Sequence, residues 1–122
     1  MKDYKDLIAW QKSMTLAKEI YALTKYLPKE ETYALADQMR RAAVSIPSNI
    51  AEGHARQSSK DYRHFLYIAR GSKAELETQL LLAKDLGYFE KVSSLKFQNT
   101  LDLLDEVGKI IFSIISKMSS TP

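Results

Sequence analysis

Residues 59–87 read SKDYRHFLYIARGSKAELETQLLLAKDLG, and this stretch decides the fold because it predicts one long helix. Ser58 followed by Asp61 is typical of a helix N-terminus, and Gly87 is typical of a C-terminus. We expect a helix over 59–86, about 40 Å long at ~1.5 Å per residue, with Gly71 and Ser72 allowing tight packing. Its inner face follows the α-helical period and comprises Tyr62, Phe65, Ala69, Ser72, Leu76, Gln79, Leu80 and Ala83.

Two further helices are predicted at the ends of the chain, over 6–27 and 94–117. Pro28 ends the first, because the residue before a proline is disfavoured in the α region, and Ser93 or Ser94 caps the last. Each helix carries two adjacent apolar stripes, which together give a wide apolar face. The first helix has Leu7, Trp10, Met14, Ala17, Tyr21 and Thr24 beside Leu16, Ile20, Leu23 and Leu27; the last has Phe97, Leu101, Leu104, Ile111 and Ile115 beside Leu103, Val107, Ile110 and Ile114.

A fourth helix is predicted over 30–52, beginning at acids suited to a helix N-terminus. Pro47 lies inside its pattern, where a proline lacks the N–H and costs about 3 kcal/mol. The apolar period resumes at Ile50, so we expect a kinked helix that continues through the proline. The core stripe is Leu35, Met39, Ala42, Ala43, Ile46 and Ile50.

The composition bounds the fold class and the compartment. The chain has 122 residues, 45% of them hydrophobic, with four glycines and three prolines, and no alternating β pattern competes. We therefore predict one all-α domain over 1–122, an antiparallel up-down four-helix bundle. Cysteine is absent, which excludes disulfides and thiolate chemistry. No apolar run approaches the roughly 20 residues that span a bilayer, so we expect a soluble, cytoplasmic protein.

The wide apolar faces of the helices over 6–27 and 94–117 suggest self-association. A lone bundle needs one stripe per helix, and surplus apolar surface usually marks an interaction site. The sequence therefore predicts a homo-oligomer built through these two helices. The alternative is an ordinary broad core face, which many globular helices carry.

No pattern in the sequence indicates catalysis or a cofactor. Di-iron bundles use two Glu-x-x-His pairs, whereas this chain has one Asp61-x-x-His64. Ser93-x-x-Lys96 has the spacing of a Ser/Lys nucleophile, but both residues fit the start of a helix. Phosphate-binding loops and dinucleotide fingerprints are absent. We predict a protein that is not an enzyme and needs neither metal nor cofactor.

Positive charge is concentrated in the middle of the chain. Residues 38–73 hold seven basic and two acidic side chains, so the segment carries +5 and the rest −2. On the predicted helix over 59–86, the spacing of Lys60, Arg63, Tyr67 and Arg70 forms one stripe with an aromatic ring inside it. Such a stripe can contact phosphates and stack on a base. The alternative is a solvated face neutralised by i, i+4 ion pairs. The predicted nucleic-acid-binding residues are Arg40, Arg41, Arg56, Lys60, Arg63, Tyr67, Arg70 and Lys73.

Two motifs carry a family resemblance: QMRRAAVSIPSNIAEG at 38–53 and ARGSKAELETQL at 69–80. With them the chain resembles the bacterial four-helix bundle family encoded within intervening sequences of 23S ribosomal RNA genes. The resemblance implies a ring-like homopentamer without enzymatic activity. It extends to the accessory variability determinant of diversity-generating retroelements, a basic pentameric barrel that binds nucleic acid and its reverse transcriptase.

Three functions remain open at this point. The first is an oligomeric bundle that binds RNA or DNA through the basic segment. The second is a scaffold that docks a protein partner such as a reverse transcriptase, and the third is a structural protein without a nucleic-acid ligand. Equally open is whether Arg40 and Arg41 face solvent, a pore, or the acids Glu75 and Glu77.

Overall fold

The computed structural model describes residues 3–119, which form helices and turns and contain no strand. The predicted all-α class is confirmed. The four α-helices are α1 (Ile8–Thr24), α2 (Leu35–His54), α3 (Ser59–Asp85) and α4 (Ser94–Ser119). Short 3-10 turns η1 (Tyr4–Asp6) and η2 (Lys29–Glu31) precede α1 and α2.

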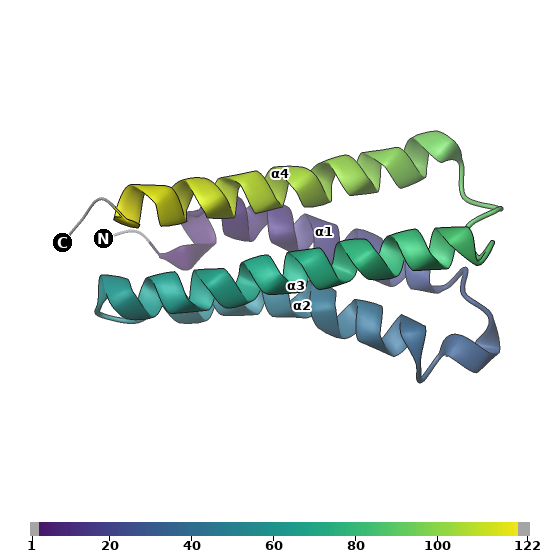
Figure 1. The fold of residues 1–122 in the computed structure, drawn as a ribbon, viewed down its shortest axis with the longest axis horizontal. Coiled ribbons are helices and arrows are strands. Elements are labelled where there is room, and N and C mark those ends of the chain that lie inside the picture. Colours follow the sequence, from purple (N-terminus) through teal and green to yellow (C-terminus); the bar gives the residue numbers. More distant parts are fainter. Residues whose placement is uncertain (1–2, 120–122) are drawn as a thin grey trace.

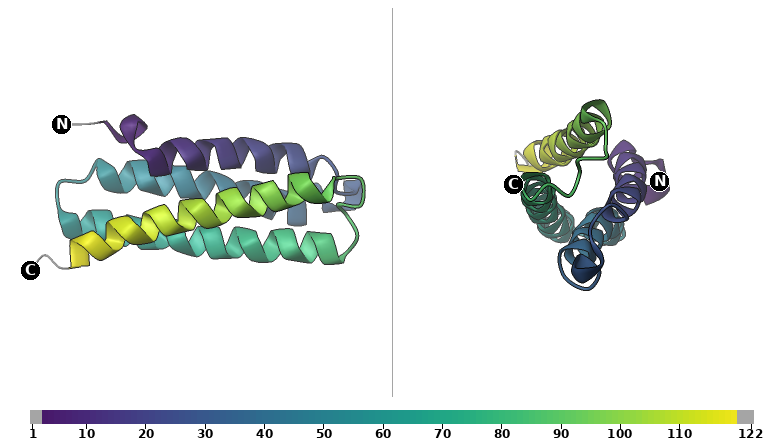
Figure 2. Two further views of the ribbon diagram at one scale, coloured as in Figure 1. Left: turned by 90° about the horizontal axis from the view of Figure 1, so that it is seen from above. Right: turned by 90° about the vertical axis from the view of Figure 1, so that its right-hand side faces the viewer.

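The helices pack around one axis as a four-helix bundle (Figure 2). Helix α1 packs against α2 and α4, and α3 packs against the same two helices. Figure 1 shows the start of α1, the end of α4 and the α2–α3 connection at one end of the bundle, with the other two connections at the opposite end. Consecutive helices therefore run in alternate directions along the bundle.

Most residues of the wide apolar faces of α1 and α4 are buried in the core. Leu16, Ile20 and Leu23 of α1 are fully buried, as are Leu104 and Ile111 of α4. Trp10, Leu103, Ile110 and Ile114 are partly buried against the same core. A broad core face thus accounts for most of this apolar surface, and self-association through α1 and α4 stays a prediction.

The start of the second helix differs from the prediction of residue 30. Residues 29–31 form the turn η2, and the backbone breaks at Ala34 (φ −121°, ψ −106°) before α2 begins at Leu35. Glu31 explains the difference: its carboxylate accepts from the Leu35 N–H at 3.3 Å and from the Tyr88 hydroxyl at 2.9 Å. A contact from the α3–α4 connection therefore holds the acid one turn ahead of the helix.

The other helix bounds lie nearer to the predicted ones. Helix α3 begins at Ser59, where the Ser58 hydroxyl accepts from the Asp61 N–H at 3.1 Å. Helix α1 ends at Thr24, three residues before the predicted end, and the chain leaves it through further turns. Helix α2 continues through Pro47 as predicted, while the bend at this proline stays a prediction.

Small and polar residues fix how α2 meets α3. The Ser45 and Ser72 hydroxyls are hydrogen-bonded at 2.8 Å, and the Asn49 amide donates to the Ser45 hydroxyl at 2.9 Å. A Cβ at Gly53 would lie 2.8 Å from the Phe65 Cβ. Gly71, in contrast, has open space around it, so the predicted tight packing holds for Ser72 and is wrong for Gly71.

Candidate nucleic-acid interface

Five of the eight predicted binding residues lie on α3 along its border with α4. Arg63 donates from Nη2 to the Met118 carbonyl at 3.4 Å, and the Arg70 guanidinium lies 4.7 Å from the centre of the Phe112 ring. Lys60 and Tyr67 share this stripe, because residues three and four apart lie on one helix face. We call this surface the α3–α4 ledge: Lys60, Arg63, Tyr67, Arg70 and Lys73 of α3, with Lys109 and Phe112 of α4.

A shallow cleft of about 360 Å³ opens in the middle of the ledge. Arg70 and Lys73 line it from α3; Asp105, Gly108, Lys109, Phe112 and Ser113 line it from α4. Lys109 pairs with Asp105 at 3.1 Å. The cleft therefore presents three cations and a hydroxyl against one acid, a donor set suited to phosphate oxygens.

Lys73 is a largely covered cation of the ledge. Its side chain is 18% exposed and pairs with Glu77 at 3.2 Å. The glycine at position 108 makes room for it, since a Cβ there would lie 2.9 Å from the Lys73 Cε. Lys60 and Arg70 are the predicted cations that stay exposed and, within residues 3–119, have no acid at ion-pair distance.

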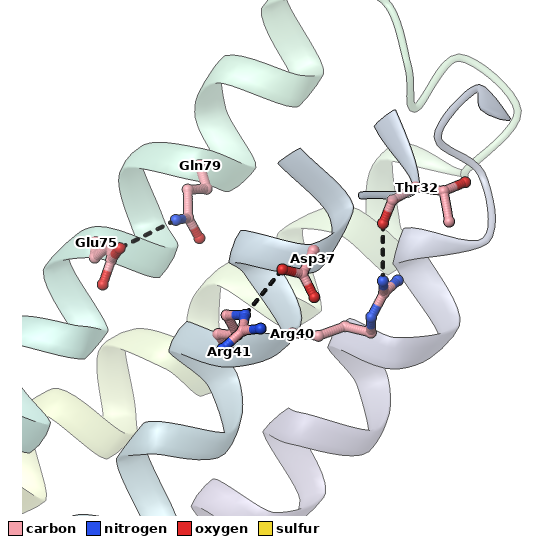
Figure 3. Close-up of polar contacts among 6 residues, drawn as sticks. All are labelled: Thr32, Asp37, Arg40, Arg41, Glu75 and Gln79. Atoms are coloured by element: carbon pink, nitrogen blue, oxygen red, sulfur yellow. Dashed lines mark hydrogen bonds and ion pairs between the residues drawn. The ribbon is translucent and has the colours of Figure 1, made fainter. Parts of the chain in front are cut away.

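Arg40 lies apart from the ledge, on α2, and is half-buried. It donates from Nη2 to the Thr32 carbonyl at 3.0 Å and from Nη1 to the Thr24 hydroxyl at 3.5 Å. Figure 3 shows its guanidinium directed at Thr32. Arg40 therefore ties α2 to α1 and to the connection before α2, and its donors are engaged within the fold.

Arg41 occupies the outer surface of α2, with a side chain 79% exposed. Its Nε donates to Asp37 at 2.8 Å, and this hydrogen bond raises the pKa of Arg41 further above its ordinary value. The acids Glu75 and Glu77 have other partners: Glu75 accepts from Gln79 at 3.4 Å (Figure 3) and Glu77 from Lys73. Neither Arg40 nor Arg41 pairs with them.

Arg56 lies in a third place, the connection from α2 to α3. It pairs with Glu52 at 2.9 Å, and its guanidinium lies 4.9 Å from the Phe65 ring centre. The basic segment of residues 38–73 is therefore divided over several faces. Because α2 makes no direct packing contact with α4, its arginines cannot complete the α3–α4 ledge of the same bundle.

A second surface feature was missed by the sequence reasoning, which placed the surplus apolar surface on the first and last helices. An apolar cleft of about 610 Å³ lies between α1 and α2. Among the residues that the structure describes, Lys18 is the one charged residue that lines it. The signal was present as stripes on two helices: Trp10, Met14, Ala17 and Tyr21 on α1, with Val44, Pro47 and Ala51 on α2.

The residues whose spacing suggested a nucleophile or a metal ligand either cap a helix or lie exposed on the surface. The Ser93 hydroxyl accepts from the Lys96 N–H at 3.1 Å, as a helix cap does. Asp61 and His64 are exposed. Across residues 3–119, no three His, Asp or Glu side chains gather as a metal site would require, and no helix has the length and apolar character of a membrane span.

Comparison with known proteins places the chain in a family. A search of curated proteins finds no match. Among solved structures, the chain is similar to a protein of unknown function from the S23 ribosomal protein family of Bacteroides thetaiotaomicron. The two share 28% identity with a TM-score of 0.77, over 88% of this chain and 98% of that chain. Residues 5–113 match the family described as 23S rRNA-intervening sequence protein, and the protein therefore belongs to that family.

Proposed function

We propose that this protein is a non-catalytic helical module that binds nucleic acid, with RNA the first ligand to test, through the α3–α4 ledge. The observation that carries the proposal is the pair of exposed cations without acid partners, Lys60 and Arg70, on one face of α3. Around them lie Arg63, Lys73 and Lys109. Within residues 3–119, the acids at ion-pair distance from these five cations are Glu77 and Asp105. A row of cations that exceeds its acids is what phosphate backbones require.

The fold favours this face over the other basic groups. Arg40 is engaged by Thr32 and Thr24, and Arg41 and Arg56 each pair with an acid one helical turn away. An ion pair on a solvated surface lowers the local field that steers an anion. The ledge is thus the part of the predicted segment with uncompensated charge, and we confine the proposed site to it.

We further propose that the functional unit is a homo-oligomer, a pentamer by resemblance to the family. A ring would present one ledge per protomer and raise the affinity for a long nucleic acid through avidity. The apolar cleft between α1 and α2 supplies surface that a lone bundle leaves uncovered. This shifts the proposed contact from α1 and α4 to α1 and α2.

The α1–α2 cleft also favours a second candidate function, a scaffold that docks a protein partner. Its lining is apolar apart from Lys18 and a few hydroxyls, and Tyr21 and Val44 are exposed there. Such a cleft suits an apolar side-chain cluster of another protein better than a phosphate backbone. For this second function we propose a polymerase as the partner, by resemblance to the retroelement accessory proteins.

A salt series separates the two candidates. Fluorescence anisotropy of a labelled structured RNA would be measured with the wild-type protein from low to physiological salt. Phosphate contacts release counterions, so the logarithm of the affinity should fall linearly with the logarithm of the salt concentration. The ledge cations should give this plot of log affinity against log salt concentration a negative slope of about three to five in magnitude. Absence of binding at low salt would reject the ledge and leave the scaffold candidate.

A further inference from the structure

Two half-exposed aromatic rings flank the central arginine of the ledge. Phe112 is 49% exposed and lies across the helix border from Arg70; Tyr67 is 50% exposed and precedes Arg70 by one turn on α3. The cations continue on either side, with Arg63 before the tyrosine and Lys73 after the arginine. Along α3 the ledge therefore alternates cation, ring and cation within about 15 Å.

These rings contribute little to the core, in contrast to Phe97 and Phe89, which are buried. Holding half of an aromatic side chain in water forgoes part of the hydrophobic gain of burying it. The Arg70 guanidinium packs on Phe112 and is thereby held in place before any ligand arrives. A planar cation stacked on a ring offers a flat surface as well as donors.

We propose that the ledge binds unpaired nucleotides, with a phosphate on Arg70 and the bases on either side of it stacked against Phe112 and Tyr67. This inference rests on the proposed function and names its ligand as single-stranded nucleic acid. In a duplex the base faces are stacked inside and only the backbone meets the ledge, so the rings gain nothing. In a single strand each base has a free face, and stacking adds to the phosphate contacts.

The test compares one single-stranded oligonucleotide with a hairpin of the same length and composition. The single strand carries 2-aminopurine, whose fluorescence is quenched when the base stacks. The variants are Phe112→Leu and Tyr67→Leu, which keep an apolar side chain and remove the ring. Tyr33→Leu is the matched control, because Tyr33 is 94% exposed in the connection before α2. Circular dichroism verifies that each variant is folded.

Wild type should bind the single strand more tightly than the hairpin and quench 2-aminopurine. Each ledge variant should weaken single-strand binding roughly five- to hundredfold, with loss of quenching and an unchanged salt slope, while Tyr33→Leu behaves as wild type. Equal affinity for strand and hairpin, or unchanged quenching in both ledge variants, would overturn the inference and leave the proposed function standing. Absence of binding to either oligonucleotide at low salt would overturn both.

Discussion

Gly53 and Gly71 differ in what surrounds them. A Cβ at Gly53 would lie 2.8 Å from the Phe65 Cβ and 3.2 Å from the Tyr62 carbonyl, whereas one at Gly71 would meet nothing within 4 Å. We predict that Gly71→Ala stabilises the protein by about 0.5–1 kcal/mol, through helix propensity. Gly53→Ala should destabilise it, because overpacking costs about 1–3 kcal/mol. Urea denaturation measures both, and a stabilising Gly53→Ala would contradict the packing.

Two adjacent arginines of α2 should differ sharply in their effect on stability. Arg40 donates to the Thr32 carbonyl and the Thr24 hydroxyl, whereas Arg41 is exposed and pairs with Asp37 alone. We expect Arg40→Met to lower the free energy of unfolding by about 1.5–3 kcal/mol. Arg41→Met should leave it nearly unchanged, because an exposed ion pair contributes little. If thermal or urea unfolding showed equal losses of stability for the two variants, the hydrogen bonds of Arg40 would not stabilise the packing of α2 against α1.

The sequence alone does not distinguish the roles of Arg40 and Arg41. Neighbouring helical residues point about 100° apart, so the two arginines face different directions, but the pattern did not show which of them has a partner within the fold. The partner of Arg40 is a backbone carbonyl eight residues away, which side-chain types do not reveal. The alternative interpretation of the basic segment was a solvated face neutralised by i, i+4 ion pairs. Two such pairs are present, Arg41 with Asp37 and Arg56 with Glu52.

The start of α2 depends on the contact between Tyr88 and Glu31, which should respond to pH. The hydrogen bond to Glu31 is the largest cause that raises the pKa of Tyr88. A raised pKa means that the folded protein favours the neutral phenol. Its stabilising contribution is present below the ordinary tyrosine pKa of about 10 and is lost as pH rises through the folded-state value.

The comparison of wild type with Tyr88→Phe isolates this contribution. Burial also raises the pKa of Tyr62, but Tyr62 is present in both proteins and its effect cancels in the difference. Wild type should be more stable than the variant at about pH 8, and this advantage should shrink at about pH 11. Urea denaturation at each pH gives the two differences, and a constant advantage would exclude the hydrogen bond as its source.

The helices differ in how far the sequence determines their ends. The bounds of α3 follow from local signals, Ser58 at one end and the apolar period along the helix. The beginning of α2 does not, because the group that holds Glu31 belongs to a residue 57 positions further along the chain. The acids before α2 were recognised as N-terminal signals, and their place relative to the helix was set by tertiary contact.

At the scale of the whole molecule, Trp10 reports on the α1–α2 cleft. It is the single tryptophan of the chain and lines this cleft. If the cleft is the contact between copies, Trp10 emission should shift to shorter wavelength as protein concentration rises. Val44→Glu, on the exposed rim of the cleft, should keep the protein monomeric and remove the shift. A clean monomer mass for wild type at micromolar concentration, by light scattering after size exclusion, would reject self-association.

The architecture was predictable and the surface was not. The apolar periods of all four helices predict one shared core, since each stripe must be buried by its neighbours. The charge of residues 38–73 predicted a single basic patch, yet α2 and α3 direct their cations to different sides of the bundle. Only Lys60, Arg63, Arg70 and Lys73, which share one stripe of α3, could have been grouped from spacing alone.

The most direct test of the ledge compares two double charge reversals that change the net charge equally. Lys60→Glu with Arg70→Glu reverses the exposed ledge cations, while sparing Arg63, which is half-buried. Lys29→Glu with Lys91→Glu reverses two exposed lysines in connections at the other end of the bundle. RNA affinity is measured at one low salt concentration on folded protein. The ledge pair should lose binding and the control pair should retain it; equal losses in the two proteins would contradict a site on the α3–α4 ledge.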